Sequence, residues 1–165
     1  MNTTPDTLFH IEDAQKYVGK EIAVTNWITL TQDQVTQFAT STKDPDWMHV
    51  DVARSQLESP YGTTIVQGFL MLSLVIHLAH EVGLIPAGTE YGLNYGLDRV
   101  RFTDVVTVGS RVRSRITLLD VTPKDHGRSL HKTQHYLEVE GEDKPAMVAE
   151  CLVLWFTKLE HDKTA

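Results

Sequence analysis

Residues 66–83, VQGFLMLSLVIHLAHEVG, are the stretch that most limits how this chain can fold. The pattern is helical, and the first two turns are apolar on nearly all sides. Such a helix offers little polar surface to water, so we expect other elements to bury it. Gly83 is a suitable residue to end it. The rest of the chain must therefore supply the surface that covers a long central helix.

The second half of the chain has the pattern of an antiparallel sheet. From residue 111 to residue 118, apolar or small side chains alternate with arginines and a threonine, which is typical of a strand with one buried face and one wet face. Turn residues separate this segment from its neighbours. The sequence predicts four strands in this half, over residues 91–102, 110–123, 129–142 and 146–157.

The first half begins with a predicted strand and continues as helices. Residues 21–30 are rich in β-branched side chains, which favour a strand. Thr31 and Gln34 have the spacing of a capping box, so we expect a helix that begins beside this pair. That helix should end before Pro45, because the residue preceding a proline disfavours the α region. A second short helix is expected within residues 50–59.

Segregated helices and strands indicate the α+β class. We predict a curled antiparallel sheet wrapped around the long central helix, because that arrangement would bury the helix on most sides. The length of 165 residues suits one domain, and we expect residues 1–165 to form a single one.

Composition excludes several classes of protein. The net charge is −7 and no block of lysine and arginine is present, so a nucleic-acid partner is not expected. The start of the chain lacks a basic segment followed by an apolar run, and the most apolar run, residues 69–76, is far too short to cross a bilayer. Cys151 is the only cysteine, so no intrachain disulfide can form. We expect a cytoplasmic protein with no membrane partner.

Asp44 and His49 are the first candidates for chemistry. They lie five residues apart in STKDPDWMHVD, with Trp47 and Met48 between them. Apolar neighbours would desolvate both groups, which raises the pKa of a carboxylate and lowers that of a histidine. Groups tuned in this way suit proton transfer near neutral pH. The alternative is that Asp44 only begins a turn and His49 is an ordinary loop histidine.

Gly68 stands where the central helix begins. The first amides of a helix have no intrahelical partner, and the positive end of the helix dipole lies there. A glycine also lets a substrate approach the backbone closely, so this amide could hold a carbonyl oxygen that becomes an enolate. The alternative is that Gly68 merely permits a tight turn into the helix.

Two further polar residues have open roles. Ser73 lies within the helix among leucines, where a serine either bonds its own backbone or orients a catalytic side chain. Asn94 is either a turn residue at a strand end or a contact to substrate.

The remaining histidines do not predict a metal site. His77, His80 and Glu81 form H-x-x-H-E, which lacks the spacing of the zinc-protease motif. We expect them on a polar helix face, and we expect His131 and His135 to face solvent from a strand. Cys151 is expected to be a small core residue. No metal is predicted.

Read together, two segments resemble the MaoC-like dehydratases, the R-specific enoyl-CoA hydratase family. They are KDPDWMHVDVARSQLESPYGTTIVQGFLMLSL and LNYGLDRVRFTDVVTVGSRVR, about the middle half of the chain. The branch most similar to them is the nodulation-protein-N-like one. The family has the hot-dog fold, in agreement with the sheet and helix predicted above.

The resemblance implies an activity and a set of roles. Family members add water to trans-2-enoyl thioesters to give (R)-3-hydroxyacyl products, with no cofactor, and usually form dimers. Carried over, Asp44 and His49 are the catalytic pair, the Gly68 amide is the oxyanion donor, and Ser73 matches a serine near the aspartate. The implied partners are an acyl-CoA or acyl carrier protein substrate and a second copy of the chain, as a homodimer or a dimer of dimers.

The sequence departs from the family in two places. The frequent D-x-N-P-I-H pattern is DPDWMH here, which keeps the aspartate and the histidine. The usual His-Gly before the helix is Gln67-Gly68, which keeps the glycine amide and changes the neighbouring polar contact, so Gln67 joins Gly68, Ser73 and Asn94 as a candidate for substrate binding.

Two alternative functions would bind the thioester in the same kind of pocket. A hot-dog thioesterase would direct water to the thioester carbonyl, but it usually carries an acid on the central helix, and Glu81 lies far from the start of that helix. A non-catalytic acyl-thioester-binding subunit would not need the intact Asp44 and His49.

Overall fold

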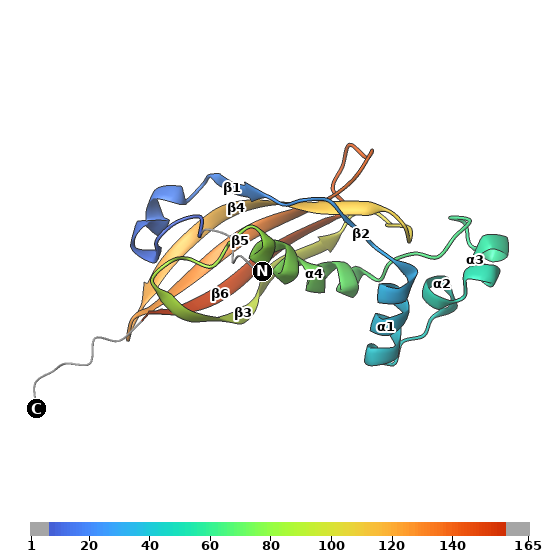
Figure 1. Ribbon diagram of the computed structural model, residues 1–165, viewed down its shortest axis with the longest axis horizontal. Helices are drawn as coiled ribbons and strands as arrows, with labels where there is room; N and C mark the ends of the chain where they lie inside the picture. Colours follow the sequence, from blue (N-terminus) through green and yellow to red (C-terminus); the bar gives the residue numbers. More distant parts are fainter. Residues whose placement is uncertain (1–6, 158–165) are drawn as a thin grey trace, which may run out of the picture.

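One antiparallel sheet of six strands forms the body of the protein in the computed structural model, which describes residues 7–157 (Figure 1). The strand order is β1-β4-β5-β6-β3, and β2 also pairs with β4. The sheet is curled and open, and it does not close into a barrel. The strands are β1 Glu21–Val24, β2 Ile28–Thr29, β3 Thr89–Phe102, β4 Arg111–Lys124, β5 Arg128–Val139 and β6 Met147–Thr157.

The four strands predicted in the second half are all present, so the α+β, hot-dog prediction is confirmed. The single strand predicted over residues 21–30 is wrong, because it is broken into β1 and β2. Thr25 lies at the break with its side chain buried, and its hydroxyl accepts a hydrogen bond from the Ser114 amide at 2.9 Å. The Thr25 amide also donates to the Ser114 carbonyl at 2.9 Å, so at this residue the hydroxyl, and not the carbonyl, accepts from the amide of β4.

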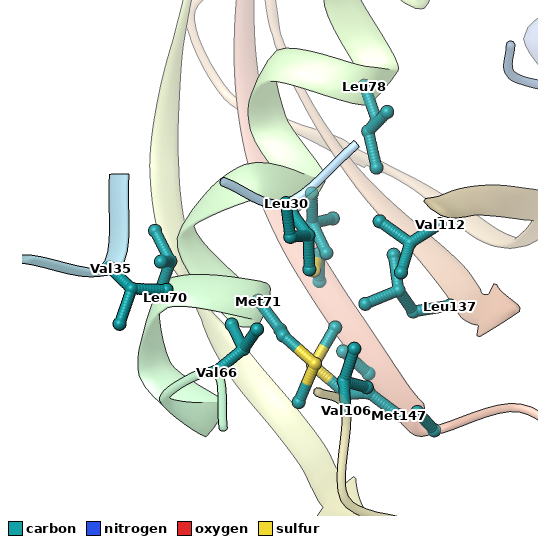
Figure 2. Close-up of a cluster of buried hydrophobic side chains, with 14 residues drawn as sticks. Leu30, Val35, Val66, Leu70, Met71, Leu78, Val106, Val112, Leu137 and Met147 are labelled. Atoms are coloured by element: carbon teal, nitrogen blue, oxygen red, sulfur yellow. The ribbon is translucent and has the colours of Figure 1, made fainter. Parts of the chain in front are cut away.

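Helix α4, Gly68–Glu81, lies on the concave face of the sheet (Figure 1). Figure 2 shows its inward side chains Leu70, Met71 and Leu78 among apolar residues of the sheet and the loops. These partners include Val112, Leu137 and Met147, all with no exposed surface. Burial of this one helix face is the main apolar contact that joins helix and sheet.

The opposite face of α4 is not covered by residues 7–157. Phe69 is 68% exposed, and Ser73, His77 and His80 are also exposed. The expectation that the first turns are buried on nearly all sides is therefore wrong for the single chain, because the sheet curls against only one side of the helix.

Three short helices project beyond one end of the sheet (Figure 1). They are α1 Gln32–Thr42, α2 Trp47–Val50 and α3 Val52–Glu58. The predicted capping box of α1 is present, with Thr31 and Gln34 bonded in both directions. A 3-10 helix, η1 Ile11–Tyr17, packs near the other end of the sheet. Within residues 7–157, no helix is long and apolar enough to cross a membrane.

The prediction that His131 and His135 face solvent is wrong, since their exposed fractions are 3% and 1%. Both lie on the concave face of β5, and nearby hydroxyls make their burial possible. The His135 ring nitrogens lie 3.2 Å from the Ser114 hydroxyl and 2.9 Å from that of Thr133. His131 Nε2 lies 3.1 Å from the Ser129 hydroxyl. Burial disfavours the charged rings and lowers the pKa of each to about 4.

We expect these histidines to destabilise the protein in mild acid. Their folded-state pKa lies below the ordinary value near 6.5, so the unfolded chain binds protons first and the unfolding free energy falls as pH drops from about 6.5 towards 4. Each ring can contribute up to about 1.4 kcal/mol per pH unit in that window. The unfolding free energy, measured by urea unfolding at a series of pH values, should fall less steeply towards acid for His131→Phe than for the parent. The exposed His77→Gln should keep the pH dependence of the parent.

Candidate active site

The end of α1 places Asp44. Lys43 has a left-handed backbone with φ 59°, its amide donates to the Thr40 carbonyl, and the Asp44 amide donates to the Ala39 carbonyl at 3.0 Å. These bonds form a Schellman motif, which satisfies the last carbonyls of the helix. The backbone of Asp44 is therefore fixed by the helix end, while its carboxylate is exposed.

The short helix α2 places His49. Asp46 begins this helix and its carboxylate accepts a hydrogen bond from the Met48 amide at 2.8 Å. The half-buried His49 ring has its Nδ1 2.8 Å from the carbonyl oxygen of Ile65. A carbonyl oxygen can only accept, so Nδ1 carries the proton. The other nitrogen, Nε2, therefore holds a lone pair whenever the ring is neutral, which is the form that a general base needs.

The expected shielding of the Asp44–His49 pair is only partly found. Trp47 and Met48 are half-buried, and the guanidinium of Arg54 lies 4.3 Å over the Trp47 ring. The Asp44 carboxylate remains exposed, so the prediction that these neighbours desolvate it is wrong for the single chain.

Backbone bonds connect the His49 turn to the segment that leads into α4. The Ile65 amide donates to the Met48 carbonyl at 3.0 Å, next to the bond between Ile65 and the His49 ring. Ile65 precedes Gly68 by three residues, which an extended chain covers in roughly 10 Å. The His49 ring and the first amide of α4 are thus brought to the same end of the fold.

Gly68 is the first residue of α4, and its backbone is not left-handed. A turn therefore does not require glycine here. A side-chain carbon at this position would lie 3.0 Å from the Phe102 ring, so the close approach of that ring explains the glycine. Within residues 7–157, the Gly68 amide donates to no backbone carbonyl. It is available to an oxygen of a bound molecule at the positive end of the helix dipole.

Gln67 is buried directly before the helix. Its side-chain Nε2 donates to the Val35 carbonyl of α1 at 3.1 Å, which links α1 to the start of α4. Its Oε1 is buried and has no hydrogen-bond partner among the described residues. The donor end of this amide is therefore used within the fold, and only the acceptor end is free.

The two remaining candidates lie further along α4 and β3. The Ser73 hydroxyl donates to the Phe69 carbonyl at 2.8 Å, which is the backbone bond that a serine within a helix commonly makes. Asn94 lies within β3, not at a strand end, so it is not the turn residue considered from the sequence. It lines a hollow of about 240 Å³ between α4 and β3, together with Leu72, Ile76, Leu97 and Cys151.

A second hollow of about 270 Å³ shares Ile76 and Asn94 with the first and also touches His80, Tyr91 and Trp155. Together they form a mainly apolar groove between α4 and β3. The Cys151 thiol faces its inner wall, and burial raises the pKa of this thiol to about 11, so the thiolate is disfavoured.

The histidines of the central helix lie away from the Asp44–His49 turn. His77 pairs with Glu81 at 3.4 Å on the exposed face of α4. Across residues 7–157, no group of three or more histidine, cysteine or acidic side chains is arranged to hold a metal ion. Sequence reasoning missed Gln32, Thr64 and Ile65, because only the folded chain brings them to the His49 turn.

Comparison with known proteins gives the chain its relatives. The model of the MaoC like domain family matches residues 13–141. The chain is 39% identical over 147 residues to 3-hydroxyacyl-thioester dehydratase Z of Mycobacterium tuberculosis, covering 89% of this chain and 96% of the relative. It is 37% identical over 154 residues to nodulation protein N of Rhizobium leguminosarum, covering 92% of each.

Among solved structures, the (R)-hydratase of A. caviae, which is involved in PHA biosynthesis, superposes with a TM-score of 0.63 at 23% identity. The match covers 82% of this chain and 94% of the hydratase. This likeness concerns the fold, and the sequence relatives carry the evidence on family.

We expect the valine side chain of Gly68→Val to block the approach of a substrate oxygen to the amide at residue 68. If that amide holds an oxyanion, turnover should fall by about 10²- to 10³-fold. The new side chain would also meet the Phe102 ring. The double variant Gly68→Val/Phe102→Ala removes that clash, so thermal stability should recover while activity stays low. Recovery of activity in the double variant would show that the clash, and not the amide, causes the loss. Gln67→His, which restores the residue usual in the family, should keep activity.

Proposed function

The chain belongs to the MaoC-like dehydratase family, and on that basis we propose that it reversibly hydrates trans-2-enoyl thioesters to (R)-3-hydroxyacyl thioesters. Membership of a dehydratase family supports a hydro-lyase. The observation that carries the proposal is the bond from His49 Nδ1 to the Ile65 carbonyl. It leaves Nε2 with a lone pair, at the same end of the fold as the Gly68 amide, which donates to no backbone carbonyl among the described residues.

In the proposed reaction, a water molecule lies between the Asp44 carboxylate and His49 Nε2. The carboxylate accepts one hydrogen bond and orients the water, and Nε2 removes the other proton as the water oxygen bonds to the β-carbon. The electrons of the double bond move to the thioester oxygen, and the Gly68 amide stabilises the resulting enolate. The His49 imidazolium then returns its proton to the α-carbon, so one molecule of water is added and the histidine is restored.

The substrate's acyl chain is proposed to enter the groove between α4 and β3. Its lining of leucine, isoleucine and tryptophan side chains suits an alkyl chain, and Asn94 is the polar group beside it. CoA and acyl carrier protein both present the acyl group as a thioester, and the name of the relative, 3-hydroxyacyl-thioester dehydratase Z, fits either carrier. No step of the proposed reaction needs a metal or a bound cofactor.

We further propose that two copies of the chain pair through β3. This strand is 14 residues long, lies at the edge of the sheet, and is exposed almost throughout. Tyr91, Leu93 and Tyr95 on it are at least half exposed, as is Phe69 on α4. A long apolar edge of this kind is normally paired or covered. A homodimer, or a dimer of dimers, would cover both the edge and the exposed face of α4.

We expect Asp44→Asn and His49→Ala each to lower the rate of crotonyl-CoA hydration by about 10²-fold or more, the usual contribution of general acid–base catalysis. Loss of absorbance by the conjugated thioester, measured together with free thiol, separates the candidate functions. A hydratase lowers the absorbance and releases no thiol, a thioesterase releases thiol, and a binding subunit does neither. Parent-level turnover in either folded variant would remove that residue from the mechanism.

We expect Tyr95→Lys to weaken the dimer, because it places a charge in the middle of the apolar edge. Light scattering at micromolar concentration should show dimers for the parent and monomers for this variant. Val24→Lys is the matched control, since Val24 is 39% exposed on β1 at the other edge of the sheet. A monomeric parent would contradict the proposal.

A further inference from the structure

We propose that Gln32 and Thr64 form a side-chain bridge that positions His49 for proton transfer, so that both are positioning residues for the reaction. The inference rests on the proposed function, because it assigns these residues a role through the catalytic histidine. Neither is part of the Asp44–His49 loop, and neither was a candidate from the sequence.

Two hydrogen bonds define this Gln32–Thr64 bridge. Gln32 is the first residue of α1, and its Nε2 donates to the His49 carbonyl at 2.8 Å. Its Oε1 accepts a hydrogen bond from the Thr64 hydroxyl at 2.6 Å. The orientation of the amide follows from the partners, because a backbone carbonyl can only accept while the hydroxyl can donate. The side chain of Gln32 therefore spans the space between α2 and residue 64.

The Thr64 end of the bridge is anchored in the body of the protein. Thr64 is 1% exposed, and its carbonyl accepts from the Val108 amide at 2.9 Å. Two residues later, the Val66 amide donates to the Val106 carbonyl at 2.8 Å. Residues 64–66 thus run as a short paired segment beside residues 106–108, which gives the bridge a rigid base.

The His49 end has no comparable anchor of its own. Helix α2 has four residues, and none of them is buried. A single helical turn is marginal by itself, so its orientation depends on the contacts it makes with the rest of the chain. Its links to residues 64–66 are the Ile65 amide on the Met48 carbonyl, the His49 ring on the Ile65 carbonyl, and the Gln32–Thr64 bridge. The bridge holds the backbone of the residue whose ring does the chemistry.

This arrangement has a direct consequence for His49. When the bridge is intact, the carbonyl of His49 is fixed, and the ring stays against the Ile65 carbonyl with Nδ1 protonated. When the bridge is lost, the turn can move and the ring can exchange tautomers, so Nε2 is no longer held as the base. Misplacement of a reacting group by about 1 Å can cost up to about 10²-fold in rate. Substrate binding in the groove should be unaffected, because Gln32 and Thr64 do not line it.

The test uses two variants that each break one bond. In Gln32→Glu, the side chain keeps its size and can still accept from Thr64, but it has no N–H for the His49 carbonyl. In Thr64→Val, the buried volume is kept and the hydroxyl is lost. Thr64→Ser retains the hydroxyl and serves as the rescue. Gln37→Ala is the control on the same helix, since its amide bonds only the Asp33 carboxylate at the surface.

Two quantities are measured on the full chain. One is kcat and KM for crotonyl-CoA, and the other is the tautomer of the His49 ring by nitrogen-15 NMR at about pH 8, above the ordinary histidine pKa of about 6.5. We expect Gln32→Glu and Thr64→Val to lower kcat by about 10-fold with KM within about twofold of the parent, in line with a small displacement of the base. Both should also lower the Nδ1–H fraction of His49, whereas Thr64→Ser and Gln37→Ala should match the parent.

If folded Gln32→Glu has the kcat and the His49 tautomer of the parent, the proposed positioning role of the Gln32–Thr64 bridge is wrong. A rise in KM with unchanged kcat would contradict it as well. If Thr64→Val fails to fold, the half-buried Gln32→Glu decides the question. A parent protein that does not hydrate crotonyl-CoA contradicts the proposed function instead. In that case the NMR measurement still shows whether Gln32 controls the His49 ring, because it requires no turnover.

Discussion

The contact between the apolar face of α4 and the concave face of the sheet is the interaction on which the rest of the structure depends. It buries Leu70, Met71 and Leu78 against the strands and so fixes the axis of the helix (Figure 2). Because the helix is rigid, its first amide is fixed at the same time. The same burial that stabilises the fold therefore also positions the proposed oxyanion donor.

In the other half of the site, α1 is anchored by the buried Val35 and Ala39, whereas the His49 turn is held mainly by hydrogen bonds. The helices α1, α2 and α3 extend beyond one end of the sheet (Figure 1), and none of the four residues of α2 is buried. Residues 64–66 connect the two parts, since they pair with residues 106–108 on one side and bond Met48 and His49 on the other. The proposed general base lies on this turn and needs several well-aligned hydrogen bonds, because each contributes only about 1 kcal/mol to stability.

The concave face of the sheet carries buried polar side chains whose effect on stability depends on pH. Ser114, Thr133 and His135 lie in the core and satisfy one another. A buried neutral histidine is tolerated while its hydroxyl partners are present, but burial lowers its pKa to about 4, so protonation in acid lowers the unfolding free energy. On the opposite face of α4, by contrast, apolar surface stays exposed beside the β3 edge, and the proposed dimer would cover it.

The sequence by itself determined the order and type of the main elements. Their signals are local: the apolar period of residues 66–83, the alternation after residue 110, and the capping box at Thr31. It also placed Asp44, His49 and Gly68 as candidates, through their spacing and a family resemblance. Only the tertiary structure decided which faces are wet. It buried His131 and His135, exposed Phe69 and Asp44, and brought Gln32 and Thr64 to His49. The hydrogen bonds of Gln32 to His49 and to Thr64 join residues 17 and 32 positions apart. The pattern of side chains along one segment holds no information on what will lie opposite that segment in the fold.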